Sequence, residues 1–260
     1  MQEDQLDRLT EQEVEDIEER GAVEDDHRPA DKGAVMRIDL HCHSEASWDC
    51  FTPLEAIPAQ CREKGIQVQA ITDHNVIKGA QTLKKMVEED PESDLTVIVG
   101  EEISTSEGEI IGLFLTQPIE AGLTPEETIK RIKADNGLVL LPHGFDPLKR
   151  FRLTPVARGR VEKDLDIIET FNARVSRPRW NQAAVVWAEH NGVLMSAGSD
   201  AHRLADIGAA WVEVPRQPIR NPDELMRALK GGVPVGDWTH PVWAFVLKVW
   251  GEVKRRLAKI

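Results

Sequence analysis

The 260-residue sequence predicts an α/β fold whose parallel strands close into a barrel. From residue 35 onward, short runs rich in β-branched and aliphatic residues alternate with segments of helical character. This alternation is typical of βαβ units, which build parallel sheets. Because roughly seven such units follow one another, a closed barrel is favoured over an open sheet.

Eight segments have the composition of strands: residues 35–41, 67–72, 95–101, 109–115, 138–142, 166–171, 193–199 and 210–214. Six helices are expected between most of them, at residues 53–64, 76–90, 124–136, 155–164, 177–191 and 222–230. Thr52, Thr124 and Asn221 each precede a proline and are predicted to cap helices. The short link ISTSEG holds no helix, so the strands on either side of it are expected to form a hairpin.

The acidic charge is concentrated at the N-terminus. The formal net charge is -13, and residues 1–35 contain 13 acidic and 4 basic side chains but few large apolar ones. Such a segment cannot bury enough surface to offset its ordering entropy, so residues 1–35 are predicted to form a mobile leader. The acidic balance argues against a stable complex with long nucleic acid. A barrel over residues 36–236 is expected to follow.

Residues 237–260 are predicted to form a basic amphipathic helix beyond the barrel, with an apolar stripe that includes Trp243 and Trp250. The helix could pack on the barrel or on a second subunit, lie on an anionic membrane surface, or pair with the acidic leader. Burial against protein is favoured, and the oligomeric state stays open.

The three cysteines form no CxxC motif, which suggests a reducing compartment. The sequence shows no apolar signal core and no run long enough to span a bilayer. A cytoplasmic location is therefore expected.

The first predicted strand ends in HCH. Successive side chains of a strand point to opposite faces, so His41 and His43 share one face and Cys42 takes the other. Two neutral imidazoles that converge in this way could bind one cation.

Polar residues suited to metals recur where the other strands end, and in a barrel these carboxyl-end loops form the active site. They are His41, His43, Asp73, His74, Glu101, Glu102, His143, Asn172, Asp200 and His202. Each alone has an ordinary structural explanation, but the recurrence predicts a shared metal site.

The ordered motifs HCH, TDHN, GEE, PHGFD, FNAR and GSDAH resemble those of the PHP (polymerase and histidinol phosphatase) family. More narrowly, they are similar to its stand-alone metal-dependent phosphoesterases. The resemblance covers about residues 36–235. It implies a distorted (β/α)7 barrel of PHP type, with two or three divalent metal ions at its carboxyl face and hydrolysis of phosphate esters.

The resemblance also implies a set of nine metal ligands. They are His41, His43, Asp49, His74, Glu102, Glu109, His143, Asp200 and His202. Glu102 takes the bridging position, and Glu102, Asp200 and His202 are the implied catalytic residues. Asp73 is expected to accept a hydrogen bond from a ligand imidazole, and Asn172 to support the ligands similarly.

Two of these positions depart from the family pattern. Asp49 lies one residue further along the chain than the commonest spacing. Glu109 stands where many relatives have histidine. A carboxylate there can ligate a cation with altered metal preference, whereas one that points to solvent would weaken one metal position.

Mixed imidazole and carboxylate ligands suit Zn²⁺, Mn²⁺ or Fe²⁺ better than Mg²⁺. Water activated by such ions would attack phosphorus, with no need for a Ser or Cys nucleophile. Cations in two carboxyl-end loops are expected to bind the substrate phosphate, although each could instead be a solvated loop charge. They are Lys149, Arg150, Arg152, Arg174, Arg177 and Arg179.

The leading hypothesis is metal-dependent hydrolysis of a small phosphorylated substrate, with nucleotides and short oligonucleotides among the candidates. A second hypothesis is an amidohydrolase, another barrel that opens with HxH. No lysine stands at a mid-barrel strand end to form a bridging carbamate, which argues against it. A third is a non-catalytic module stabilised by metal.

Overall fold

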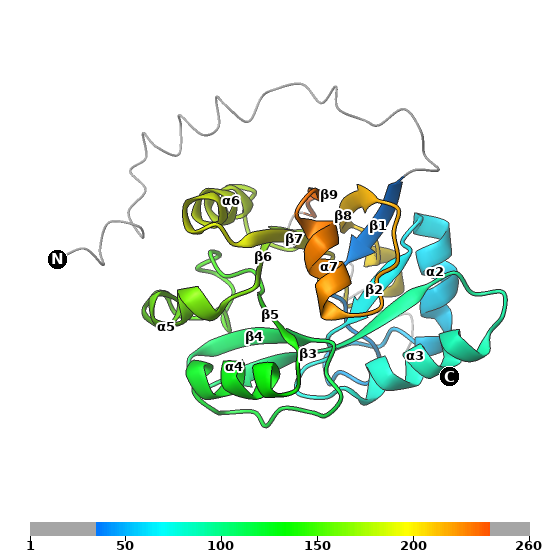
Figure 1. Cartoon of the computed structure of the whole chain (residues 1–260), viewed down its shortest axis with the longest axis horizontal. Helices are drawn as coiled ribbons and strands as arrows, with labels where there is room; N and C mark the ends of the chain where they lie inside the picture. The colour runs from blue at the N-terminus through cyan, green and yellow to red at the C-terminus, as the bar shows by residue number, and fades with distance from the viewer. Residues whose placement is uncertain (1–34, 240–260) are drawn as a thin grey trace, which may run out of the picture.

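The structure is a computed structural model that describes residues 35–239 (Figure 1). Apart from Val35 and residues 237–239, the predicted leader and the predicted C-terminal helix, with Trp243 and Trp250, lie outside the described residues. Within the described range, no helix is long and apolar enough to cross a membrane.

Nine strands within residues 35–239 form one sheet, in the order β7-β6-β5-β4-β3-β2-β1-β8-β9. They are β1 (Val35–Asp39), β2 (Val68–Ile71), β3 (Thr96–Thr105), β4 (Gly108–Leu113), β5 (Leu138–Leu141), β6 (Ile167–Asn172), β7 (Leu194–Gly198), β8 (Ala210–Pro215) and β9 (Val233–Gly236). The first eight coincide with the predicted strands. The ninth was missed because it is short and contains Pro234, which argues against a strand except at a sheet edge.

The sheet curves into a nearly closed barrel (Figure 1). β1, β2 and β3 are parallel, as are β5, β6 and β7, whereas β4 runs antiparallel between β3 and β5. β8 also runs antiparallel to β1, and β9 antiparallel to β8. The predicted hairpin and the α/β barrel of PHP type are both confirmed, and β4 and β8 interrupt its parallel order.

The barrel closes where the chain continues beyond β1 and β7. The amide of Leu40 donates a hydrogen bond to Ala197 O at 3.2 Å, and the amide of Asp200 donates to His41 O at 2.8 Å. The amide of His43 donates to Ala201 O at 3.0 Å. We call this junction of residues 40–43 with residues 197–201 the seam.

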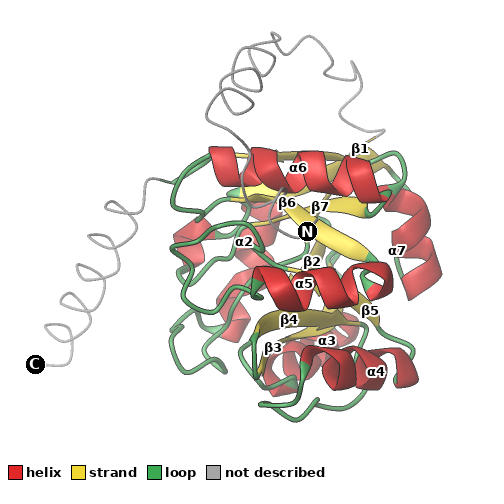
Figure 2. Ribbon diagram, turned by 90° about the vertical axis from the view of Figure 1, so that its left-hand side faces the viewer, coloured by secondary structure: helices red, strands yellow, loops and turns green. Residues whose placement is uncertain are grey.

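Helices surround the sheet, and Figures 1 and 2 both place α4, α5 and α6 in a row along one flank. They are α2 (Ile57–Lys64), α3 (Lys78–Glu89), α4 (Pro125–Ala134), α5 (Pro155–Val161), α6 (Arg179–Asn191) and α7 (Pro222–Leu229), with 3-10 turns η1 (Leu54–Ala56), η2 (Glu162–Asp164) and η3 (Leu204–Asp206). Thr124 and Asn221 cap α4 and α7 as predicted. The predicted cap at Thr52 is wrong, because Pro53 leads into η1 before α2 begins.

β2 and β5 are buried on both faces, which explains their nearly continuous apolar runs, whereas β9 has no buried residue. Val97 and Val99 of β3 pack in the same apolar cluster as Leu83 of α3. Ile98, between them, belongs to a second cluster with Ile38 of β1. Because both clusters hold the strands rigidly, the loops at the strand ends are built on a fixed frame.

Candidate metal centre

The structure brings all nine predicted ligands together at the carboxyl side of the barrel. They come from the loop after β1, the segment after β2, the β3–β4 hairpin, and the loops after β5 and β7. Their ligand atoms form four overlapping groups, and within each group the atoms lie within 4.8 Å of one another. The groups are His43, Asp49, His74 and His202; His41, His43 and Glu102; His41, His143 and Asp200; and His74, Glu102 and Glu109.

Glu102 is the carboxylate that two of these groups share. Its Oε2 atom lies 3.2 Å from His41 Nε2 and 3.3 Å from His43 Nε2. The same oxygen is 3.4 Å from His74 Nδ1, and Oε1 is 3.1 Å from His143 Nε2. One buried carboxylate therefore contacts four imidazoles, a geometry suited to bridging two cations.

Asp49 and Glu109 both contact imidazoles of the cluster, although each departs from the family pattern. Asp49 Oδ2 lies 2.8 Å from His202 Nε2, and Ser47 Oγ donates to its other oxygen at 2.9 Å. Glu109 is buried, with Oε1 3.5 Å from His74 Nδ1. Glu109 thus faces the cluster and not the solvent.

Backbone conformation directs several of these side chains. His41 and His43 share a face as predicted, with their Nε2 atoms 3.2 Å apart, while Cys42 packs in the apolar core. His143 and Asp200 have φ angles of 31° and 50°, in the left-handed region that residues other than glycine rarely adopt. Such strain is typical of residues held in place for function.

The electrostatics of the cluster keep two of its carboxylates ionised. Burial favours neutral His41, but the charges of Glu102, Glu169 and Asp200 outweigh it and raise the pKa of His41 well above its usual range. Burial favours the neutral acid at Glu102, but the charge of His41 and the hydrogen bond from His143 outweigh it and hold the pKa well below its usual range. At Asp200, Lys149 and Arg174 overcome burial in the same way and lower the pKa. Burial instead raises the pKa of Glu109, aided by the charge of Glu102.

The donor set fits divalent cations. His41 Nδ1 lies 3.1 Å from Glu169 Oε1, so a cation that displaces the Nε2 proton of His41 would leave the Nδ1 hydrogen bond in place and meet the Nε2 lone pair. That lone pair faces an acceptor oxygen of Glu102 and the Nε2 atom of His43. A cation that replaces this proton would be ligated by all three side chains, so these residues suit a metal.

Two of the six predicted phosphate-binding cations reach the cluster. Lys149 Nζ lies 2.5 Å from Asp200 Oδ2, and Arg174 Nη1 donates to Asp200 O at 2.9 Å. Arg174 also contacts His202. Among the described residues, the other four make no hydrogen bond or ion pair with the nine predicted ligands. Those four are Arg150 and Arg179, which lie over the rings of Phe151 and Trp180, and Arg152 and Arg177.

The two loops that carry these cations are joined by Asp146. Its carboxylate accepts hydrogen bonds from Ser176 N at 2.6 Å and from Ser176 Oγ at 2.7 Å. Asp146 is buried in the loop that carries Lys149, and Ser176 lies two residues after Arg174. This link fixes the two cations relative to each other.

The two predicted supporting residues differ in what they contact. Asn172 Nδ2 donates to Asp200 Oδ2 at 3.3 Å, so it touches a predicted ligand. The prediction that Asp73 accepts a hydrogen bond from a ligand imidazole is wrong. Asp73 accepts from Ser44 N at 2.6 Å and from Ser44 Oγ at 2.7 Å, which anchors the loop after β1.

Sequence reasoning missed Glu169, which supports the cluster from the middle of β6. Besides His41, it accepts hydrogen bonds from His143 N at 2.7 Å and from Asn172 Nδ2 at 2.9 Å. A Cβ atom on Gly198 would lie 2.3 Å from Glu169 Oε1, so only glycine fits beside it. A lone carboxylate inside the apolar run DIIETF was the available clue.

We expect Glu169→Gln to weaken metal binding by about 10- to 100-fold, because the amide cannot accept from both His41 and the His143 backbone. Titration of metal against a competing chelator would measure the change. Glu88→Gln, on the exposed side of α3, serves as the surface control. Unchanged metal affinity in Glu169→Gln would contradict the supporting role.

Glu101 points away from the cluster. It is buried, accepts from Ile119 N at 2.8 Å, and burial raises its pKa from 4.5 to about 7. The folded chain therefore holds this proton more tightly than the unfolded chain does, and stability is lost as the pH rises from about 4.5 through about 7.

Glu101→Gln removes this titration. Between pH 4.5 and pH 8, the stability of the variant relative to the natural chain should rise by up to about 3 kcal/mol. Urea unfolding at both pH values would measure it. A relative stability that does not change with pH would show that Glu101 ionises normally in the fold.

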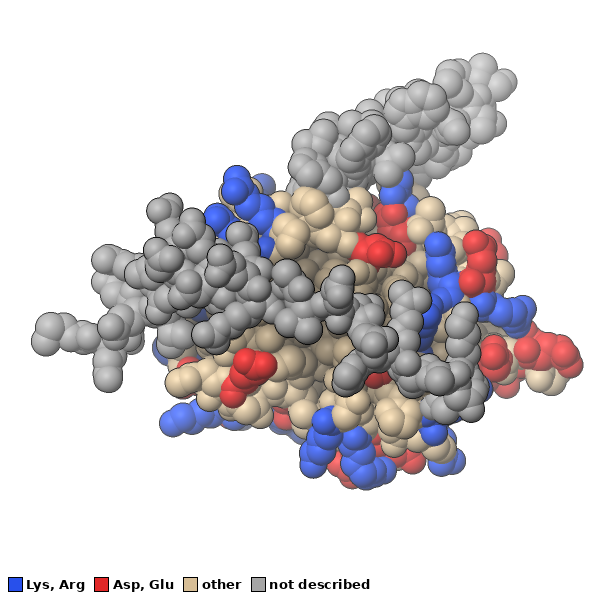
Figure 3. Space-filling view, turned by 90° about the horizontal axis from the view of Figure 1, so that it is seen from above, with Lys and Arg blue, Asp and Glu red and all other residues tan. Residues whose placement is uncertain are grey.

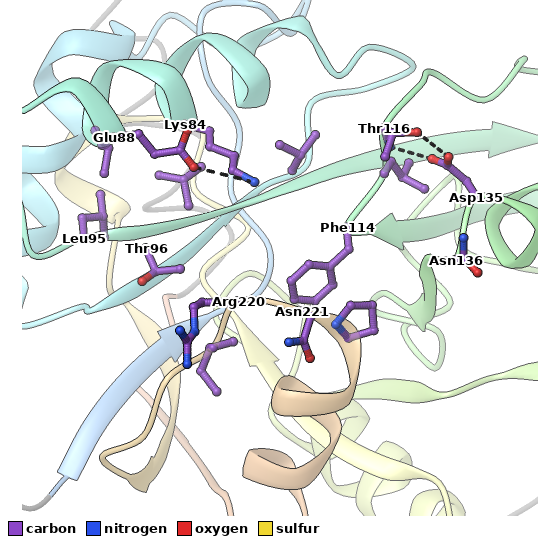
Figure 4. A pocket seen from close by; sticks show the side chains of 16 residues that line it. Lys84, Glu88, Leu95, Thr96, Phe114, Thr116, Asp135, Asn136, Arg220 and Asn221 are labelled. Carbon is purple, nitrogen blue, oxygen red and sulfur yellow. Dashed lines mark hydrogen bonds and ion pairs between the residues drawn. The ribbon is translucent and has the colours of Figure 1, made fainter.

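A cavity of about 560 Å³ lies elsewhere, between α3, β3 and the start of α7 (Figure 4). Figure 4 shows Phe114 and Asn221 facing each other across it, with Lys84 and Arg220 at its edge. None of the nine predicted ligands lines this cavity. The metal cluster, and not this cavity, is therefore the candidate functional site.

Comparison with known proteins agrees with this arrangement. The PHP domain model matches residues 39–165, and the PHP-associated model matches residues 178–234. Among solved structures, a two-domain protein from Bacteroides vulgatus containing a predicted PHP-like metal-dependent phosphoesterase has a TM-score of 0.63. It shares 15% identity, and the match covers 80% of this chain and 67% of that chain. At this identity the likeness concerns the fold alone.

Two uncharacterized proteins of Methanocaldococcus jannaschii are similar in sequence. The first is 40% identical over 148 residues, covering 53% of this chain and 82% of the relative. The second is 34% identical over 193 residues, covering 73% of this chain and 75% of the relative. With these matches and the shared domain, the chain belongs to the PHP family.

Proposed function

We propose that this protein is a metal-dependent phosphoesterase that hydrolyses a small phosphorylated substrate. PHP family membership supports a metal-dependent hydrolase. The observation that carries the finer proposal is the pair of cations at Asp200: Lys149 and Arg174 reach the same side chain that faces the imidazole cluster. A phosphoryl group bound beside that cluster would meet positive charge from both sides.

The ligand cluster and the two cations beside it, Lys149 and Arg174, would have different roles in the reaction. When bound, divalent cations supply Lewis acidity, which polarises a phosphoryl oxygen and makes water a better nucleophile near neutral pH. Glu102, His41 and His43 would hold such cations. Lys149 and Arg174 would bind non-bridging oxygens and neutralise the charge that develops in the transition state.

Asp200 and His202 lie where an attacking water could be held. Asp200 Oδ1 is 3.4 Å from His202 Nδ1, and His202 Nε2 faces Asp49. Burial, with the charge of His43, lowers the pKa of His202 to about 4, so its imidazole is neutral at pH 7. Asp200, held ionised by its two cations, can accept a hydrogen bond from an attacking water and orient it.

A cysteine nucleophile is not needed and is poorly placed. Cys42 is fully buried, and burial raises the pKa of its thiol well above its usual range. Because the thiolate is the reactive form, a buried and protonated thiol is inert. This supports direct attack by water.

The charge distribution supports a small substrate over a long polyanion. On the face drawn in Figure 3, Lys and Arg side chains are interspersed with Asp and Glu side chains.

We propose Zn²⁺, Mn²⁺ or Fe²⁺ as the cofactor, because five imidazoles and four carboxylates form the predicted ligand set.

Hydrolysis of a panel of phosphorylated metabolites, with protein reconstituted separately with each metal, tests the proposal. Monoester cleavage is followed as phosphate release, and diester cleavage as formation of the monoester and the alcohol. We expect turnover of at least one monoester or diester, abolished by a chelator and restored by metal. A fully metal-loaded protein that hydrolyses no member of the panel would argue for a binding module instead.

A further inference from the structure

An exposed tryptophan stands at the mouth of the metal centre. Trp48 is 73% exposed, and its indole centroid lies 6.0 Å from the imidazole centroid of His74. His74 in turn stacks on the fully buried His43, with centroids 4.6 Å apart. The three rings thus form a column that runs from the buried centre of the cluster to the surface.

The loop that carries Trp48 is held firmly on both sides of it. Ser47 N donates to Ser44 O at 3.0 Å, and Cys50 N donates to Ser47 O at 3.3 Å. Ser47 Oγ also accepts a hydrogen bond from His74 N at 3.3 Å. The backbone that carries Trp48 is therefore tied to the segments of two predicted ligands, Asp49 and His74.

Other exposed apolar side chains also gather near the site. Of the seven large exposed hydrophobic residues among residues 35–239, four lie on the two loops that carry Asp49 and Lys149. They are Trp48 and Phe51 after β1, and Leu148 and Phe151 after β5. Exposed apolar groups concentrated beside a polar site indicate contact with a ligand.

We propose that Trp48 is a specificity-determining residue that stacks on a planar heteroaromatic group of the substrate, so that the site selects nucleoside phosphates over phosphates of simple sugars. This inference rests on the proposed phosphoesterase function. The phosphate would bind at Lys149 and Arg174. Arg174 contacts His202, whose ring centroid lies 6.3 Å from that of His74, the ring beside Trp48, so the indole is close to the proposed phosphate site. Base–aromatic stacking tolerates any base, because every base presents a π face.

The test compares two ligands that differ only in the base. They are the 5′-phosphonates of adenosine and of ribose, in which carbon replaces the ester oxygen so that neither can be hydrolysed. Calorimetric titration of the full-length, metal-reconstituted protein should show about tenfold or tighter binding of the adenosine ligand. In Trp48→Ala that affinity ratio should fall close to one.

Two further variants separate stacking from disturbance of the loop. Trp48→Leu keeps apolar bulk without a π face and should also lose the preference, whereas Val156→Ala, which removes an exposed apolar side chain on α5, should retain it. An affinity ratio near one in the natural protein, or a ratio unchanged in both Trp48 variants, would overturn the proposal.

The outcome is independent of the phosphoesterase assay. A Trp48-dependent preference without hydrolysis of any monoester or diester would reject the proposed function and keep the recognition site. Hydrolysis of an ester without a preference for the base would reject the recognition site and keep the proposed function.

Discussion

Replacing Glu102 with glutamine is expected to lower phosphate ester turnover by about a thousandfold or more while the fold persists. The amide keeps the shape of the carboxylate but removes its charge, and it places an NH₂ group against His41 or His143, both of which contact Glu102. Neither change touches the apolar clusters that hold the barrel. Steady-state kinetics, metal content and thermal unfolding of the same preparation would measure the effects.

The neighbouring residue provides a matched control for this experiment. Glu101 is equally buried and one position away, but its side chain bonds to Ile119 N on the other side of the strand. Glu101→Gln should therefore retain turnover. If Glu102→Gln turned over substrate at nearly the natural rate, Glu102 could not be a bridging ligand.

Each chain is expected to bind at least two divalent cations and to be stabilised by them. A ligand present at 100 times its dissociation constant stabilises the folded state by about 2.7 kcal/mol. For a barrel of this size, that corresponds to a rise in Tm of about 5–10 °C. Elemental analysis after reconstitution and thermal unfolding with and without a chelator would check both values.

The same measurement on Glu102→Gln distinguishes binding at the cluster from binding elsewhere. Its rise in Tm should be much smaller, because the variant lacks the carboxylate that contacts four imidazoles. One ion or none per natural chain, or an equal rise in Tm for both proteins, would contradict the assignment.

The sequence was sufficient to locate the ligand-bearing positions because strand ends in a barrel converge. His41, His74 and Asp200 follow different strands, and the parallel sheet brings them together whatever their loops do. The hairpin was readable for a similar reason, since a link as short as ISTSEG cannot hold a helix.

What could not be predicted depends on loop paths and side-chain direction. Nothing in the order of residues distinguishes Lys149, which reaches Asp200, from Arg150, which lies over Phe151. Glu169 escaped notice because its strand reads as apolar core. Asp73 was misassigned because adjacency to His74 in sequence does not reveal that its carboxylate faces Ser44.

The seam also has a consequence for how the chain folds. At the seam, the amide of Ser199 donates a hydrogen bond to Asp39 Oδ1, and these two residues are 160 positions apart in sequence. Contacts this distant carry a large loop-closure entropy and slow the search for the native topology. The seam is therefore expected to be among the last junctions to form and the first to open.

Predicted ligands sit on both sides of this junction, with His41 and His43 on one side and Asp200 and His202 on the other. A cation held by both sides would clamp the barrel shut after the rest of the chain has folded. Amide hydrogen exchange at Leu40 and Asp200 should then slow markedly when metal is added, while exchange in the middle of β3 should change little. Equal slowing at all three places would mean that the cation stabilises the barrel globally and not at its closing junction.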